Sequence, residues 1–398
     1  MQCVLLEPFL VGRIAVKRGL AKTKRAKHMK GAHASALCDA SDIPIRLVDR
    51  PGKYPVNSSQ LDDVRKWGQD VAARNIAYFE ASNGSPMLKE LYQELEWLIT
   101  DSTAERVECS PRLKVATSGD DGFSASSTTR SAILRQSIPE LQQLWMRRII
   151  DRVPLQYLTN TAHWRDMEFT VNTSVLIPRP ETELLIDFAC EWLRELESNT
   201  ENHTMNYNLL SGPWLDLGTG SGILAIALAK ELQRKCADAS SVYAVDVSVA
   251  ALELARDNAR RNGVQDSIKT LHGSWFNPIK KDVRFTGILT NPPYIPTDLL
   301  ESLQPEVCSH EPWLALDGGG GDGSAHLVTI CRDVKNFLLP GGLFAVETHG
   351  LEQARLVQHL LNSTEAFRDV HLKADYSGIV RYVTARKVND PGVMDGAC

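Results

Sequence analysis

The chain has 398 residues, of which 43% are hydrophobic and 23% are charged, and its formal net charge is -5. This length accommodates two domains and the composition is ordinary for a globular protein, while an acidic total disfavours a general nucleic-acid coat. No apolar run is long enough to span a bilayer. The eight cysteines include no Cys-x-x-Cys pair, so we expect reduced, mostly buried thiols and no metal at the neighbouring Cys308 and His310.

Residues 1–58 lack a sustained periodicity and are predicted to be a basic leader and linker. An acid-free basic leader resembles an organellar transit peptide. A disordered basic tail and a gene-model extension are the alternatives. No acidic residue occurs between Glu7 and Asp39, whereas eight basic residues do: Arg13, Lys17, Arg18, Lys22, Lys24, Arg25, Lys27 and Lys30.

Residues 59–152 are predicted to form a small helical domain. From Leu61 to Ile99 apolar residues recur at three- and four-residue steps, and Asn83-Gly84-Ser85-Pro86 divides this stretch into two helices. A segment near 100–131 is rich in Ser, Thr, Asp and Gly and predicts an insert or disordered loop. Helical character returns over Ile133–Ile150.

Residues 153–387 are predicted to form an α/β domain, followed by a tail at 388–398. The amphipathic stretch Glu183–Leu196 predicts a helix, after which strands and helices alternate. Alternation indicates a parallel sheet with helices on both faces, whose ligands bind beyond the carboxyl ends of the strands. We expect strands at Trp214–Leu217, Val242–Val245, Ile268–His272, Gly287–Thr290 and Leu343–Glu347, helices at Ile223–Lys235, Val249–Arg261, Ala325–Phe337 and Leu351–Leu361, and a late antiparallel pair at Phe367–Leu372 and Ile379–Thr384.

A glycine-rich loop, Asp216-Leu217-Gly218-Thr219-Gly220-Ser221-Gly222, follows the first of these strands and opens a helix. Glycine permits a sharp turn and close approach of the backbone to a ligand. Alone, the loop fits either a dinucleotide pyrophosphate or a simple tight turn, and Ile223 stands where a nicotinamide fingerprint needs its last glycine. Asp246, which ends the second strand, can accept the ribose hydroxyls of a nucleotide or of S-adenosylmethionine, or can cap the next helix. Trp275 can stack on adenine or belong to the core.

The most specific element is Asn291-Pro292-Pro293-Tyr294, which directly follows a buried strand. Two prolines end the strand ladder because they have no N–H to donate. A side-chain or exocyclic NH2 is a poor nucleophile, and the Asn291 side-chain oxygen and the Pro292 carbonyl can each accept one of its N–H groups. This arrangement would hold the nitrogen against the sulfonium methyl and favour the positive charge that develops. Tyr294 would offer a face to the planar substrate group, and we expect direct in-line transfer.

The chain resembles the HemK/PrmC family of protein N5-glutamine methyltransferases over about Val153 to Lys387. The marker beyond the Asn-Pro-Pro-Tyr loop is the string Val175-Leu176-Ile177-Pro178-Arg179-Pro180-Glu181-Thr182-Glu183. Further similar segments are Pro154–Leu158, Ala315–Gly319, Glu347–Gly350 and Ser377–Ile379.

The resemblance implies a seven-stranded Rossmann-like class I methyltransferase domain with a small N-terminal helical domain. It implies that S-adenosylmethionine is the cofactor and that the substrate is the glutamine of the Gly-Gly-Gln loop of a class I peptide chain release factor, held by the helical domain. Its cofactor contacts match Gly218, Thr219, Gly220, Ser221, Gly222, Asp246, Trp275 and Asn291, and its substrate contacts match Asn291, Pro292, Pro293 and Tyr294. We expect a monomer with no direct nucleic-acid or membrane partner. We expect the protein to be mitochondrial, or otherwise cytoplasmic.

Three departures from the family pattern affect the surroundings of the site and no reacting group. Asn160 stands where glycine is common, Trp164 where phenylalanine is usual, and Ser274 where aspartate is frequent. Two other functions remain open. An adenine-N6 or cytosine-N4 nucleic-acid methyltransferase would use the same loop but needs a basic base-flipping domain. A catalytically silent scaffold would retain the fold, although Asp246 and Asn291 are intact.

Overall fold

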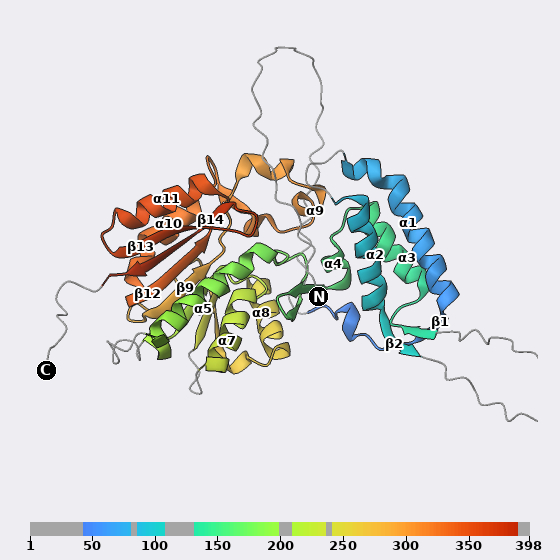
Figure 1. Cartoon of the computed structure of the whole chain (residues 1–398), viewed down its shortest axis with the longest axis horizontal. Helices are drawn as coiled ribbons and strands as arrows, with labels where there is room; N and C mark the ends of the chain where they lie inside the picture. The colour runs from blue at the N-terminus through green and yellow to red at the C-terminus, as the bar shows by residue number, and fades with distance from the viewer. Residues whose placement is uncertain (1–42, 81–85, 108–130, 199–208, 236–240, 389–398) are drawn as a thin grey trace, which may run out of the picture.

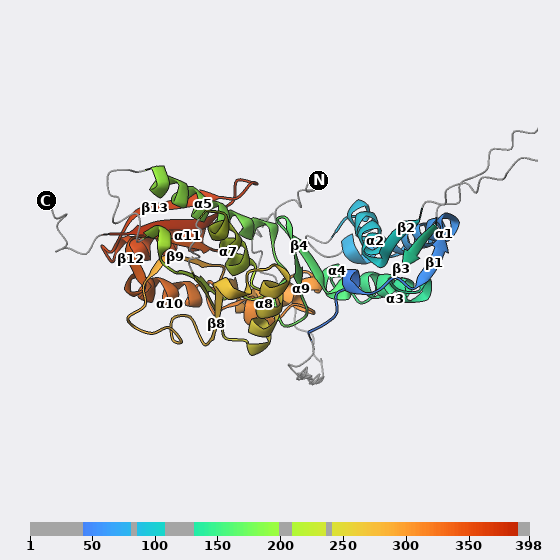
Figure 2. The same cartoon turned by 90° about the horizontal axis from the view of Figure 1, so that it is seen from below.

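The computed structural model describes residues 43–80, 86–107, 131–198, 209–235 and 241–388. Two parts lie side by side along the long axis, a helical part and a sheet covered by helices (Figure 1). The view turned by 90° shows the same division, with the short helices α4 (Leu155–Thr159) and α9 (Pro305–Cys308) between the two parts (Figure 2). The predicted basic leader through residue 42, the middle of the predicted insert and most of the predicted tail lie outside the described residues.

The helical part consists of three helices around one apolar core. They are α1 (Ser58–Glu80), α2 (Leu88–Ser102) and α3 (Ile138–Ile149), and the first two lie on either side of the predicted break. Trp145 is fully buried between them, and its indole N–H donates to the carbonyl of Gly68 at 2.9 Å. The buried indole N–H of Trp145 is therefore satisfied within this core.

The prediction of a leader and linker through residue 58 is wrong for its last part. A 3-10 helix at Leu47–Asp49 buries Leu47 completely, and β1 (Tyr54–Asn57) pairs antiparallel with β3 (Ser131–Leu134). The other side of β3 pairs with β2 (Thr103–Val107), so the near end of the predicted insert is also a strand. Strands of four or five residues show little periodicity, and these pair with partners distant in sequence.

The predicted seven-stranded sheet is confirmed, with the order β13-β14-β12-β9-β6-β7-β8. β14 runs antiparallel to both of its neighbours, β12 and β13, and the other strands all run parallel to one another. The late antiparallel pair is therefore also confirmed. The strands are β6 (Trp214–Leu217), β7 (Val242–Asp246), β8 (Ile268–His272), β9 (Phe285–Thr290), β12 (Leu338–Glu347), β13 (Phe367–Ala374) and β14 (Val380–Lys387).

Helices cover both faces of this sheet. Alternate strand residues point into two separate cores, as when Leu289 joins one core and Ile288 the other. The helices α5 (Glu183–Ser198), α7 (Ile223–Lys235) and α8 (Val249–Arg261) pack on the first core, and α10 (Ala325–Asp333) and α11 (Leu351–Asn362) pack on the second.

Two short strand pairs that were not predicted lie outside the main sheet in the described part of the chain. β4 (Thr161–Trp164) pairs antiparallel with β5 (Met167–Thr170), and β10 (Ile295–Pro296) pairs parallel with β11 (Asp317–Gly319). Each strand has only two to four residues, too few to show an alternating pattern.

The structure accounts for two departures from the family pattern. Asn160 ends α4 with a φ of 54°, in the left-handed region that favours glycine but that Asn also enters. The indole N–H of Trp164 donates to the Arg179 carbonyl at 2.9 Å, a hydrogen bond that phenylalanine cannot make.

A buried ionic cluster joins the two parts of the molecule. Glu306 of α9 accepts from Arg148 Nη1 at 3.0 Å and from Arg152 Nε and Nη2 at 2.7 and 2.6 Å. The Arg152 guanidinium also lies over the Phe79 ring, 3.9 Å from its centroid. Burial alone would raise the pKa of Glu306, but the hydrogen bonds from Arg152 and the charge of Arg148 lower it.

Replacing Glu306 with alanine should destabilise the fold by about 3–5 kcal/mol, because it leaves the buried Arg152 guanidinium without its carboxylate. Arg148 loses one of its two carboxylate partners and keeps Glu94. Urea unfolding measures this change. The control is Glu352→Ala, since Glu352 is 88% exposed in its pair with Arg355 and exposed pairs contribute little. Equal midpoints for the two variants would show that the cluster does not stabilise the junction.

Candidate active site

The glycine loop lies at the carboxyl end of β6 and is fixed against β7. Gly218, Gly220 and Gly222 have φ values of +74°, +54° and +89°, all in the left-handed region. The N–H groups of Gly218 and Thr219 donate to the carbonyl of Val245 at 2.9 and 3.0 Å. These bonds hold the loop in the sharp turn that the glycines permit.

Asp216 lies beneath this loop and carries an acceptor with no partner. Its Oδ2 accepts from Thr219 Oγ1 at 2.6 Å and from the Ala225 N–H at 3.1 Å. Its Oδ1 is buried without a hydrogen-bond partner among the described residues. Burial raises the pKa of Asp216 to about 7. A buried unpaired carboxylate oxygen is costly, so the site fits a ligand that brings an N–H group or a positive charge.

Asp246 links the glycine loop to the end of β7. Its Oδ2 accepts from the Gly220 N–H at 2.9 Å and its Oδ1 from the Ser248 N–H at 2.8 Å. The cap of α8 is Ser248, whose hydroxyl accepts from the Ala251 N–H, so the alternative of Asp246 as that cap is wrong. The Asp246 carboxylate can accept further hydrogen bonds from a ligand.

Trp275 lies beside the glycine loop. A Cβ built on Gly218 would be 3.6 Å from Trp275 Cζ3, and the Trp275 ring is 5.3 Å from the ring of His326. Trp275 is half-buried against the second core. Ser274, the third departure, is exposed. The indole can therefore serve the core and a ligand beside Gly218 together.

The Asn291–Tyr294 loop follows β9, the strand next to β6. Asn291 Nδ2 donates to Thr182 Oγ1 at 3.0 Å, and the Tyr294 hydroxyl donates to Glu347 Oε1 at 3.1 Å. No donor in the described part of the chain reaches Asn291 Oδ1 or the carbonyl of Pro292. The two predicted acceptors are therefore available, and a Cβ on Gly218 would be 3.9 Å from the Asn291 carbonyl oxygen.

The backbone after Tyr294 is clamped by a glycine-rich segment. A Cβ on Gly318 would lie 2.1 Å from the Gly323 carbonyl oxygen and 2.7 Å from Tyr294 Cα. Gln353 Nε2 donates to the carbonyls of Tyr294 and Asp322, at 2.9 and 2.7 Å. The segment Asp317-Gly318-Gly319, which belongs to the similar segment Ala315–Gly319, thus has a packing role that was not predicted from its sequence.

The Ile-Pro-Arg-Pro string binds the segment that joins β10 to β11. Glu311 is 4% exposed and accepts from Arg179 Nη2 at 2.5 Å and from the Ile177 N–H at 3.1 Å. Thr182, from the same string, reaches Asn291. Thr182 and Glu347 were not predicted as site residues, although both belong to strings that carry the resemblance.

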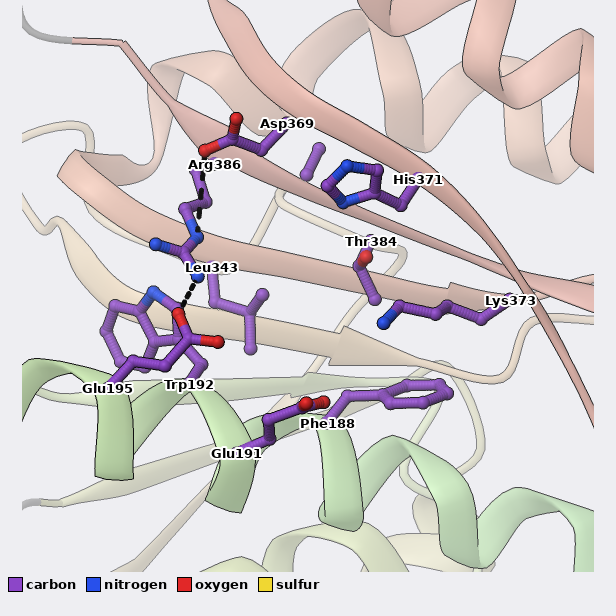
Figure 3. Close-up of a pocket in the computed structure, with 11 residues that line it drawn as sticks. Phe188, Glu191, Trp192, Glu195, Leu343, Asp369, His371, Lys373, Thr384 and Arg386 are labelled. Carbon is purple, nitrogen blue, oxygen red and sulfur yellow. Dashed lines mark hydrogen bonds and ion pairs between the residues drawn. The ribbon is translucent and has the colours of Figure 1, made fainter.

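The predicted site residues lie at or after the carboxyl ends of the four neighbouring strands β6, β7, β8 and β9. A separate cavity of about 220 Å³ lies between α5 and the β13–β14 hairpin, lined by both acidic and basic side chains (Figure 3). It reaches β12 at Leu343, four residues before the carboxyl end, so it is not part of this site.

Nowhere in the described ranges do three possible metal ligands gather, and no described helix is long and apolar enough to cross a membrane.

Comparisons with known proteins agree with this geometry. Residues 197–301 match the family model described as "Methyltransferase small domain". The chain is 38% identical over 261 residues to a "Release factor glutamine methyltransferase" of Synechocystis sp., covering 65% of this chain and 82% of that protein. It is 40% identical over 254 residues to the protein of the same name from Thermosynechococcus vestitus, covering 64% and 81%.

One solved structure with a similar fold is the ribosomal protein L11 methylase of Lactobacillus delbrueckii subsp. bulgaricus. It is 18% identical, with a TM-score of 0.36, and the match covers 55% of this chain and 84% of that one. At this TM-score the likeness adds nothing to what the sheet order establishes.

Gly318→Ala should lower Tm by several degrees, because its Cβ would overlap two backbone segments and such overpacking costs about 1–3 kcal/mol. Gly320→Ala is the matched control, since a Cβ there meets nothing within 4 Å. Differential scanning calorimetry of both variants tests the clamp. If Gly318→Ala and Gly320→Ala have the same Tm, the close packing of Gly318 against the Tyr294 backbone does not stabilise the fold.

Proposed function

Because the chain belongs to the release factor glutamine methyltransferase family, we propose that it methylates the side-chain amide nitrogen (N5) of the glutamine in the Gly-Gly-Gln loop of a class I peptide chain release factor. The chain is an S-adenosylmethionine-dependent methyltransferase. An adenine-N6 nucleic-acid methyltransferase, the alternative, is not favoured.

The observation that supports this substrate is the pair of free acceptors at the end of β9. A glutamine amide has two N–H groups, and Asn291 Oδ1 and the Pro292 carbonyl can accept one each. Holding both N–H groups orients the nitrogen, and both acceptors stabilise positive charge on it. The same acceptors would exclude a carboxylate, which has no N–H to offer.

The residues around the glycine loop fit S-adenosylmethionine. When bound, this cofactor supplies a methyl group on a positively charged sulfur, which a nitrogen lone pair can attack. Gly218–Gly222, Asp246, Trp275 and Asn291 would hold it. The buried unpaired oxygen of Asp216 matches a ligand that carries positive charge.

The surrounding groups support transfer without a catalytic base. Burial and the charge of Glu347 raise the pKa of Tyr294 well above its ordinary value, so the phenol stays protonated and donates to Glu347. Both Glu347 oxygens already accept hydrogen bonds. The nitrogen would lose its proton to solvent after transfer.

We further propose that the helical part holds the release factor. This part is joined through Glu306 to the segment that leads into the clamp on Tyr294. The basic stretch before Asp39 supports a mitochondrial location, and nothing in the site needs a second copy of the chain.

Incubation with labelled S-adenosylmethionine should transfer label to a mitochondrial class I release factor and not to its Gln→Ala loop mutant. Asn291→Ala should reduce transfer at least about 100-fold, because it removes an acceptor for the developing charge. Asn336→Ala, at an exposed asparagine, is the control. Label on DNA or RNA in place of the factor would contradict the proposal.

Cofactor affinity should fall as pH drops below about 7, because Asp216, with its raised pKa of about 7, is then neutral and no longer attracts a positive ligand. Calorimetric titration between about pH 6 and 8 measures the Kd. In Asp216→Asn the dependence should flatten, whereas Asp266→Asn, at an exposed site, should keep it. An unchanged slope in Asp216→Asn would show that another group controls binding.

A further inference from the structure

A buried hydrogen-bond chain runs from the reacting loop to the neighbouring strand. Asn291 Nδ2 donates to Thr182 Oγ1 at 3.0 Å, and Thr182 Oγ1 donates to Glu347 Oε2 at 2.8 Å. Thr182 and Glu347 are each only 1% exposed. The register places Val346 of β12 opposite Thr290 of β9, so Glu347 and Asn291 leave adjacent strands at the same level.

When Glu347 is ionised, the hydrogen bonds that link Asn291, Thr182 and Glu347 can run in only one direction. A carboxylate can only accept, so the single hydroxyl proton of Thr182 goes to Glu347. The Thr182 oxygen can then only accept from Asn291, which must turn its NH2 group toward Thr182. As a result, Asn291 Oδ1 faces away from Thr182 and remains available to a substrate N–H.

We propose that Glu347 and Thr182 are positioning residues that fix the orientation of the Asn291 side-chain amide. Its Nδ2 then faces Thr182, and its Oδ1 can accept from a substrate NH2 group. The inference rests on the proposed function for the identity of the substrate. Neither residue is a catalytic residue, because each acts through Asn291.

A neutral group at position 347 would remove this control. It could donate to Thr182, and Thr182 could then donate to an Asn291 side chain turned by 180°. The turned amide would present its NH2 group to the substrate NH2, and neither could accept. The acceptor pair would lose one member while the fold stayed intact.

The surroundings of Glu347 are consistent with a role other than stability. The groups that face it are Thr182, Tyr294, Arg381 and Glu181. Arg381 is bound by Asp375 at 2.8 Å, and Glu347 makes no salt bridge within the described residues. Burial raises its pKa to about 7. A buried carboxylate of this kind disfavours folding once it is ionised.

The test compares steady-state kinetics of the full chain with a release factor as substrate. Glu347→Gln and Thr182→Val should each lower kcat by about 10–100-fold and change the Kd for S-adenosylmethionine much less than kcat, because the glycine loop and Asp246 are unaltered. Thr182→Ser should restore kcat to within a few-fold, because it returns the hydroxyl. Thr290→Val, which removes a buried hydroxyl bonded only to the Leu217 carbonyl, is the matched control.

Coupling distinguishes this role from simple support of the fold. If Glu347 acts through Thr182, the double variant Glu347→Gln/Thr182→Val should be no slower than the slower single variant. Tyr294→Phe removes the other partner of Glu347, and its effect should add to that of Thr182→Val. Additive losses in Glu347→Gln/Thr182→Val would overturn the proposal.

The pH profile gives a second readout. With S-adenosylmethionine saturating, so that its pH-dependent affinity does not contribute, wild-type kcat/KM for the release factor should rise as the pH rises through about 7, because Glu347 becomes ionised. Glu347→Gln should lack this rise. Because the raised pKa makes ionised Glu347 destabilising, Glu347→Gln should melt at or above the wild-type Tm at pH values above 7. The same pH rise in Glu347→Gln and wild type would contradict the assignment.

NMR keeps this test separate from that of the proposed function. If wild type leaves the release factor unlabelled, the proposed function fails, but the Asn291 side-chain amide still reports its orientation. Its protons should be protected from exchange in wild type and Thr182→Ser, and exposed in Thr182→Val. Equal protection in Thr182→Val would overturn the positioning role.

Discussion

The site depends on the point where β9 stops being a strand. Pro292 and Pro293 have no N–H to donate, so the sheet cannot hold the chain beyond Asn291. Other segments hold it instead: Gln353 binds the Tyr294 carbonyl, and the Gly318 and Gly323 backbones pack against it. The prolines therefore free the carbonyl of Pro292 for a substrate while the neighbours keep its position fixed.

The segment between β10 and β11 connects the reacting loop to the helical part of the molecule. Between β10 and β11, Glu306 is held by two arginines and Glu311 is held by Arg179 and the Ile177 N–H. The segment then returns as β11 to pair with β10, directly after Tyr294. A partner bound on the helical part would thus meet a reacting loop that is already rigidly placed relative to it.

The main sheet was predictable because its central strands β6 and β9 are buried along their whole length and helices alternate with the strands in chain order. β1, β2 and β3 escaped prediction since each is short and pairs only with strands distant in sequence. The reacting groups Asn291 and Pro292 were predictable because their chemistry follows from residue type. The roles of Thr182 and Glu347 were not, because they arise only where β9 and β12 end side by side, and the last residues of these strands, Thr290 and Glu347, are 57 positions apart in sequence.

The most direct test of the proposed function is tandem mass spectrometry of a release factor after methylation by the chain. We expect one methyl group, on the side-chain amide nitrogen of the glutamine in the Gly-Gly-Gln loop. A factor carrying glutamate at that position should stay unmodified, because a carboxylate cannot donate to Asn291 Oδ1 and the Pro292 carbonyl. Methylation of that glutamate, or of another residue in place of the glutamine, would contradict the proposed function.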